Sequence, residues 1–308
     1  MSLDLQKASR ETIRKGSKSF AAAAALFDAE TRTDAEMLYA WCRHCDDVID
    51  GQQLGHGMAA PDPEAARERL EALRAATRSL FAGVPAKDPS FAAFQRVAER
   101  RRIPEWCALE LLEGFAMDVT ARRYHTLGDT LEYCWGVAGV VGVMMALVMG
   151  VAPDDAPTLR RAQDLGLAFQ LTNIARDVAE DAANGRVYLP AEWLAEAGIP
   201  EAEVGAPERR PALFTVAERL LAAAEPYYAS AVSGLARLPL RSAWAIAAAR
   251  GVYRQIGVEV LRRGPAAWDR RVSVSGRAKV WLALQGGATA LASRGRRETE
   301  RPPLWTRI

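Results

Sequence analysis

Apolar residues recur at intervals of three and four along almost the whole chain, whereas strand-like alternation of Val, Ile, Thr and aromatic residues is scarce. The first spacing gathers apolar side chains on one face of an α-helix, and the second is typical of a half-buried strand. Breaks rich in Gly and Pro divide the helical stretches at residues 51–63, 82–89, 150–157, 185–211, 238–239 and 264–265. None is long or biased enough to be a flexible linker. We therefore predict an all-α protein, a single large bundle of about ten helices.

The stretch from Trp135 to Ala152 contains no charged and no polar side chain. Its length meets the minimum for a membrane span. However, Asp154 and Asp155 follow it where a basic flank would be expected, and a helix that is apolar on all sides also fits the centre of a large bundle. Glycines at 136, 139 and 142 would give that helix a groove for a long hydrocarbon. We predict a buried helix, with a membrane span as the alternative.

The net charge of the chain is only +2, with 40 Lys and Arg residues against 38 Asp and Glu residues. No global basic field favours nucleic acid as a partner. From Leu261 to Ile308, however, eleven basic residues stand against three acidic ones. This surplus could bind diphosphate or an anionic membrane, and a solvated helical face explains it equally well.

Four cysteines and an N-terminus without an apolar signal segment predict a protein of the reducing cytoplasm. Cys42 and Cys45 form a CxxC motif around His44. No second pair follows at a zinc-like spacing, and the motif falls inside a predicted helix. We interpret these cysteines as buried, apolar-like residues.

Two aspartate pairs, Asp46/Asp50 and Asp177/Asp181, carry the strongest functional signal. Each pair is spaced by four residues in a predicted helix, where like charges repel by roughly a few tenths of a kcal/mol. Such pairs favour a counter-cation. Oxygen ligands without nearby histidine or cysteine suit Mg²⁺, which leaves its other positions to water and substrate phosphates. The pairs therefore indicate a diphosphate substrate.

Each aspartate pair extends a polar stripe along its helix. The first stripe falls within an arc of about 60° and the second within about 80°, and they consist of Tyr39, Arg43, Asp46 and Asp50, and of Gln170, Asn173, Asp177 and Asp181. Two ordinary amphipathic surface helices are the alternative. Facing each other across a cavity, the stripes could clamp metal ions that neutralise a leaving diphosphate. An apolar, aromatic cavity would then shield the carbocation from water.

At these residues the chain resembles the squalene/phytoene synthase family, in particular its bacterial phytoene synthase branch. The matching segments are residues 16–20, 39–50, 133–139, 170–181 and 185–190. The second aspartate run with its Gln and Asn, followed by Arg186-Val187-Tyr188-Leu189-Pro190, is the most specific of them. The resemblance implies one isoprenoid (class I terpenoid) synthase domain over residues 1–308, with a central cavity.

The resemblance also implies roles for individual residues. Metal ligands would be Asp46, Asp50, Asn173, Asp177 and Asp181, and the four aspartates would be catalytic together with Arg43 and Tyr133. Substrate would be bound by Ser17, Ser19, Phe20, Tyr39, Arg43, Gln170, Asn173, Arg176, Tyr188, Tyr253, Arg270 and Arg271. Only one of Arg270 and Arg271 would contact diphosphate, because the spacing after Tyr253 varies in the family. Taken alone, Tyr133 and Tyr253 are more typical of core aromatics.

The activity implied by the resemblance is the head-to-head condensation of two geranylgeranyl diphosphates. The reaction would pass through prephytoene diphosphate to phytoene and diphosphate, the first committed step of carotenoid biosynthesis. It would require Mg²⁺, with Mn²⁺ as a substitute, and no NADPH. We expect a cytoplasmic protein in peripheral contact with the inner face of the membrane, because the product is insoluble and the C-terminal stretch is basic. Squalene synthases usually carry a C-terminal membrane anchor, which we do not expect here.

Three other functions compete with this one. A dehydrosqualene or squalene-type synthase would use farnesyl diphosphate instead. A chain-elongating prenyltransferase would also carry the DDxxD formed by residues 46–50, although the second run keeps only its outer aspartates. A non-catalytic helical protein could bind membranes through its basic C-terminal region.

Overall fold

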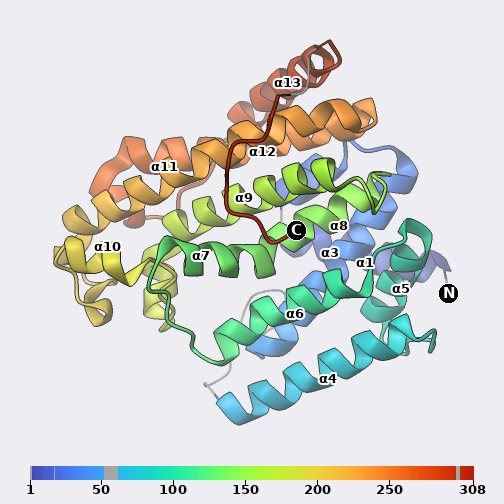
Figure 1. Cartoon of the computed structure of the whole chain (residues 1–308), viewed down its shortest axis with the longest axis horizontal. Coiled ribbons are helices and arrows are strands. Elements are labelled where there is room, and N and C mark those ends of the chain that lie inside the picture. Colours follow the sequence, from blue (N-terminus) through green and yellow to red (C-terminus); the bar gives the residue numbers. More distant parts are fainter. Residues whose placement is uncertain (1, 17, 52–61, 296–298) are drawn as a thin grey trace.

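The computed structural model describes residues 2–16, 18–51, 62–295 and 299–308, and these residues form helices and no strand (Figure 1). The predicted all-α class is confirmed. The α-helices are α1 (Ser2–Gly16), α2 (Lys18–Ala24), α3 (Ala29–Asp50), α4 (Pro63–Phe81), α5 (Pro89–Arg101), α6 (Glu105–Val119), α7 (Leu127–Cys134), α8 (Val140–Val148), α9 (Ala156–Ala183), α10 (Ala191–Glu196), α11 (Arg210–Gly234), α12 (Leu240–Arg263) and α13 (Gly276–Ser293). That the chain is one domain stays a prediction.

The Gly- and Pro-rich breaks identified in the sequence lie between helices, as predicted. Further breaks divide the chain into more helices than expected. α3, for example, begins after the N-cap Asp28, whose carboxylate accepts the Thr31 amide at 2.9 Å, and ends at Gly51 in the left-handed region. The unpredicted breaks after α5 and α6 use left-handed backbone at Arg102 and Ala121. Non-glycine residues rarely adopt that conformation, so the composition gives no warning of these turns.

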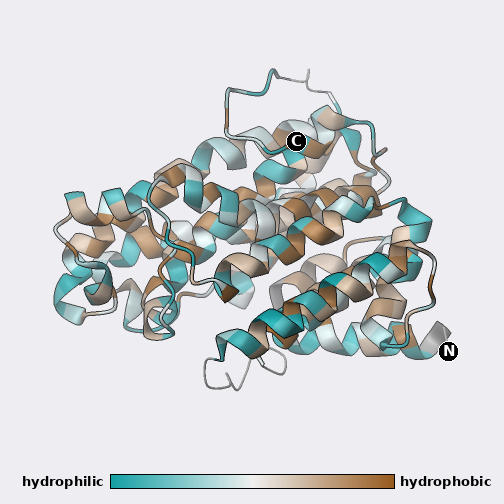
Figure 2. Ribbon diagram, turned by 60° about the horizontal axis from the view of Figure 1, so that its bottom comes forward, coloured by the Kyte–Doolittle hydropathy of each residue, from teal (hydrophilic) through white to brown (hydrophobic). Residues whose placement is uncertain are grey.

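α9 runs through the middle of the molecule and packs against α8, α11 and α12 (Figure 1). α4 and α13 lie at opposite edges, α4 against α6 and α13 against α12. The second aspartate run therefore sits on a central helix, and the first lies on α3, which contacts α5, α6 and α8. Hydrophobic residues concentrate along the middle helices in Figure 2.

The uncharged stretch is part of a continuous helical segment, Leu127–Val148, that includes a π-helical turn over Trp135–Gly139. By length and composition it could cross a membrane, but 67% of its most apolar window is buried inside the protein. Its glycines serve close helix packing: a Cβ on Gly136 would meet the Gly114 backbone at 2.5 Å, and one on Gly142 would overlap the Ala162 carbonyl. The described structure thus agrees with a buried helix.

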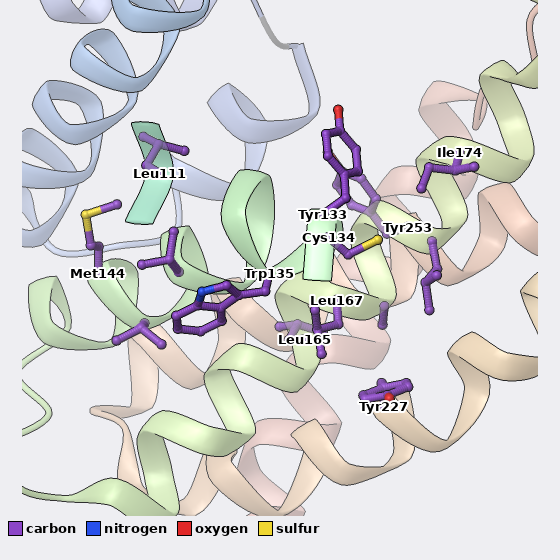
Figure 3. Close-up of a cluster of buried hydrophobic side chains, with 14 of the residues drawn as sticks. Leu111, Tyr133, Cys134, Trp135, Met144, Leu165, Leu167, Ile174, Tyr227 and Tyr253 are labelled. Atoms are coloured by element: carbon purple, nitrogen blue, oxygen red, sulfur yellow. The ribbon is translucent and has the colours of Figure 1, made fainter. Parts of the chain in front are cut away.

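Figure 3 shows a cluster of buried side chains from α6, α7, α8, α9, α11 and α12, including Tyr133 and Tyr253. The four cysteines are free thiols, three of them buried and Cys42 half-buried. Burial raises the pKa of Cys42 to about 12. A protonated thiol is neither a good nucleophile nor a metal ligand, so the CxxC motif behaves as apolar packing.

Candidate active site

A cavity of about 460 Å³ lies between α2, α3, α6, α9, α11 and α12 and is lined mainly by apolar side chains. Its charged and amide lining residues are Arg43, Asp46, Asp118, Arg161, Gln170, Asn173 and Arg186. Four of them, Arg43, Asp46, Gln170 and Asn173, belong to the two predicted stripes. Arg186 contacts Asp50 of the first stripe, Asp118 lies near that stripe, and Arg161 lies apart from both. Both stripes therefore border one cavity with part of their length, which is the arrangement of facing helices and not that of two separate surface helices.

The first stripe places Tyr39, Arg43 and Asp46 in the cavity wall. Arg43 Nη1 donates to Asp46 Oδ2 at 2.5 Å. Asp50, one turn further along α3, accepts two hydrogen bonds from Arg186, one of them at 3.2 Å. Burial raises the pKa of Asp46 to about 6, and the carboxylates of Asp50 and Asp118 add to the effect. Two carboxyl groups, each paired with an arginine, thus lie one turn apart at this end of α3.

The second stripe on α9 enters the cavity with Gln170 and Asn173. Asn173 Nδ2 donates to Gln170 Oε1 at 3.2 Å. Asp177 accepts from Arg176 at 2.8 Å and from Arg271 at 3.1 Å. Burial, together with Asp177 and Glu180, raises the pKa of Asp181 to about 7. Asp177 and Asp181 lie outside the cavity wall. Asp177 is there in contact with Arg271, whose side chain is exposed to solvent.

Arg271, and not Arg270, reaches the aspartates. Its guanidinium contacts Asp177 and lies 3.3 Å from Glu180, whereas the described contact of Arg270 is made by its carbonyl, which accepts from Arg263. Arg271 is thus the one of the two that lies beside the second aspartate pair, and which of them contacts diphosphate stays a prediction.

The predicted aromatic residues also converge on the cavity. Phe20 lies 6.0 Å, between ring centroids, from both Tyr39 and Tyr253, and Tyr253 stacks on Phe169 at 4.1 Å. Tyr133 lines the cavity and stacks on Tyr188 at 4.3 Å. Ser17 lies outside the described residues. Ser19 belongs to α2, but its side chain is also outside what is described.

Asp118 on α6 was missed by sequence reasoning. It lines the cavity, and its two oxygens accept from Tyr188 at 2.8 Å and from Tyr133 at 3.3 Å. Burial raises its pKa to about 6, against the attraction of Arg186. In the sequence Asp118 is a single carboxylate at the end of an otherwise apolar stretch. No second carboxylate lies four residues before or after it, so the pattern indicates only the end of a helix. Arg186 was part of the matching motif but was given no role.

The donor set was tested against a divalent metal. The candidate ligands are all oxygens, and Asn173 Oδ1 is buried without a hydrogen-bond donor in the described structure. A buried acceptor without a partner is costly, and a cation would satisfy it. Among the described residues, no three Asp, Glu, His or Cys side chains lie close enough together to hold a metal as they stand. Asp46, Asp50 and Asp177 are paired with arginines instead. The all-oxygen donor set and the unpartnered Asn173 Oδ1 fit a divalent metal.

This fold and site define an all-α isoprenoid synthase, a prenyltransferase-type enzyme. The model of the squalene/phytoene synthase family matches residues 13–278, and the chain belongs to that family. Its members use prenyl diphosphates and generally depend on a divalent metal. The predicted family and fold are thereby confirmed.

Named relatives agree with this assignment. The chain is 55% identical to the 15-cis-phytoene synthase of Pantoea ananas over 298 residues, 96% of each chain. It is 54% identical to the phytoene synthase of Pseudescherichia vulneris, again over 96% of each. A crystal structure of a dehydrosqualene synthase superimposes with a TM-score of 0.83 at 26% identity, covering 94% of this chain and 98% of that one. The predicted phytoene synthase function is confirmed by the names of the sequence relatives, and the fifteen-carbon alternative is not favoured.

Proposed function

We propose that this chain joins two molecules of geranylgeranyl diphosphate head to head, through prephytoene diphosphate, and forms phytoene and diphosphate without NADPH. The observation that carries the proposal is an apolar cavity whose polar lining includes Arg43 and Asp46 of α3 and Gln170 and Asn173 of α9. Such a cavity suits substrates with a long hydrocarbon tail and a diphosphate head. The names of the relatives support the choice of product.

The arginines bound to the aspartates would bind the diphosphate. Arg43 holds Asp46, Arg186 holds Asp50, and Arg176 and Arg271 hold Asp177. Mg²⁺, or Mn²⁺ in its place, would be held by Asp46, Asp50, Asn173, Asp177 and Asp181 and would neutralise the departing diphosphate. The guanidinium groups of these arginines would bind phosphate oxygens, which they can do in a bidentate manner.

The rest of the cavity would protect the cation left after diphosphate departs. Phe20, Tyr39, Tyr133 and Tyr253 place aromatic rings in its wall, and ring faces attract cations. Burial holds the pKa of Tyr133 well above its usual value, so its phenol stays protonated. Asp118 accepts that proton's hydrogen bond and fixes the ring. The protonated phenol of Tyr133 is therefore a poor nucleophile and does not trap the cation.

Localisation is part of the proposal. A forty-carbon hydrocarbon is insoluble in water, so we place the enzyme in the cytoplasm, in peripheral contact with the inner face of the membrane. No nucleic acid is proposed as a partner, given the net charge of +2.

Substrate competition tests the proposal. Purified protein with Mg²⁺ is given geranylgeranyl diphosphate, farnesyl diphosphate, or geranylgeranyl with isopentenyl diphosphate, and the products are separated by chromatography. We expect a forty-carbon hydrocarbon from the first at a higher kcat/KM than any thirty-carbon product from the second. A longer prenyl diphosphate from the third mixture would indicate chain elongation instead.

A further inference from the structure

The exposed face of α13 is apolar, although a surface helix normally presents polar side chains to solvent. Val280, Trp281, Leu284 and Leu291 are between 59% and 64% exposed, and they are the most exposed large apolar residues of the described chain. Val280, Leu284 and Leu291 fall within an arc of about 40° on the helix. The opposite side, with Gly286 and Ala290, is buried against α12. α13 therefore turns apolar surface both inward and outward.

This face lies at one edge of the molecule, on the outer side of α12 (Figure 1). The C-terminal residues do not cover it: Trp305 and Ile308 accept hydrogen bonds from α9 and Arg301, and the tail runs back over the bundle. Large apolar side chains gathered on one exposed helix face are typical of an interaction site.

Basic residues flank the patch. Arg277 is exposed one turn before Val280, on the same face. Arg294 follows the helix at its other end, where its guanidinium donates to the carbonyls of Ala236 and Leu238. From Leu261 to Ile308 the chain has eleven basic and three acidic residues. Two copies of this helix packed against each other, parallel or antiparallel, would bring Arg277 close to another basic end. An anionic surface avoids that repulsion, and apolar residues flanked by basic ones are the pattern of interfacial helices.

A second, smaller pocket of about 60 Å³ opens beneath α13. It is lined by Lys279 and Ala283 of α13, by Leu26, and by Val252 of α12. Four residues belong to the walls of both this pocket and the large cavity: Phe20, Ala23, Ala249 and Tyr253. Only a layer one side chain thick thus separates the cavity from the underside of the α13 face.

We propose that α13 docks on an anionic lipid bilayer through Val280, Trp281, Leu284 and Leu291, and that the pocket beneath it is where the hydrocarbon product passes from the cavity into the lipid. Docking holds α13, which covers this pocket on the outside, against the lipid, so the product would reach the bilayer along the flank of α13 that carries Lys279 and Ala283. The exit part rests on the proposed function, whereas the docking part depends only on the surface of α13.

Vesicle flotation tests the docking. The full chain is mixed with vesicles of phosphatidylglycerol and phosphatidylcholine, or of phosphatidylcholine alone. We expect binding to the first that weakens with salt, and at least about a tenfold lower bound fraction for the double variant Trp281→Glu/Leu284→Glu. Val84→Glu, an exposed apolar residue in the loop after α4, is the matched control and should bind as the unmodified chain does. Far-UV circular dichroism verifies that each variant is folded.

Equal vesicle binding by the double variant and the unmodified chain would overturn the docking surface. So would a dimer in gel filtration that Trp281→Glu dissociates while vesicle binding is absent, because the face would then serve a second copy of the chain.

The exit is tested by Ala283→Phe, which fills the small pocket from a residue that does not line the large cavity. With vesicles present, we expect unchanged diphosphate release in the first turnover and a several-fold slower steady state. Ala292→Phe, on the exposed side of the same helix, is the control. An unchanged steady state for Ala283→Phe would overturn the exit. Absence of any first-turnover release in the unmodified chain would instead refute the proposed function.

Discussion

Replacing Asp118 by Asn should stabilise the folded protein at neutral pH and impair catalysis. Burial raises the pKa of Asp118 from 3.8 to about 6, so the folded state disfavours the carboxylate. For an acid with a raised folded pKa, the unfolded state ionises first, and stability falls as pH rises between the two values. The shift corresponds to about 3 kcal/mol once pH exceeds 6. Asn is never charged and escapes this loss.

The amide has a cost of its own. Asp118 accepts from Tyr133 and Tyr188, and Asn keeps a single acceptor oxygen, so we subtract about 1 kcal/mol for one hydrogen bond. The net gain of Asp118→Asn is then about 2 kcal/mol at pH 8. At pH 5 the ionisation of Asp118 costs the unmodified protein only about 1.5 kcal/mol, half of the cost at pH 8. The net gain of Asp118→Asn at pH 5 is therefore about 0.5 kcal/mol. The difference between the two pH values does not depend on the hydrogen-bond correction.

Urea unfolding of the metal-free protein, followed by circular dichroism at pH 5 and pH 8, measures both values. Asp129→Asn is the control, because the hydrogen bonds from Thr126 hold the pKa of Asp129 below its usual value. Its substitution should cost stability at both pH values. A stability difference for Asp118→Asn that is the same at pH 5 and pH 8 would refute the reasoning. Turnover of Asp118→Asn should fall, because Tyr133 and Tyr188 lose a charged acceptor.

Four further outcomes are expected. Asp46→Asn or Asp177→Asn should each lower turnover by about a hundredfold or more, because a metal ligand is lost, while the circular dichroism spectrum is unchanged; full activity in both would contradict the site. Arg271→Gln should raise KM for the diphosphate substrate, whereas Arg270→Gln should leave it within about twofold. Chelation with EDTA should stop diphosphate release, and added Mg²⁺ or Mn²⁺ should restore it. Gly166→Ala should lower the free energy of unfolding by about 1–3 kcal/mol in urea titration, because a Cβ there would overlap the backbone of the π-helical turn.

Periodicity was enough to predict the helical class and the central apolar helix, because each depends on spacing along a single helix. That the two stripes share a cavity was only one of the arrangements that their spacing allowed. Tyr39, Arg43 and Asp46 were predicted to share one face of a helix, and all three line the cavity. Turns made by Arg102 and Ala121 could not be predicted, since their left-handed backbone is imposed by tertiary packing and not by residue type.

Contacts between distant segments were also beyond the sequence. Asp118 gains its significance from Tyr133 and Tyr188, which reach it from other elements. The pairing of Arg186 with Asp50 spans 136 residues. The choice of Arg271 over Arg270 depends on which side chain turns toward α9, and neighbouring positions in a loop do not encode that choice.

The stoichiometry of the reaction tests the central claim most directly. Purified protein is incubated with geranylgeranyl diphosphate and Mg²⁺, without NADPH, and the released diphosphate and extracted hydrocarbon are both quantified. Head-to-head condensation predicts phytoene and two diphosphates for each molecule of phytoene formed. A prenyl alcohol with one diphosphate per substrate, or a reaction that forms hydrocarbon only when NADPH is added, would contradict the account.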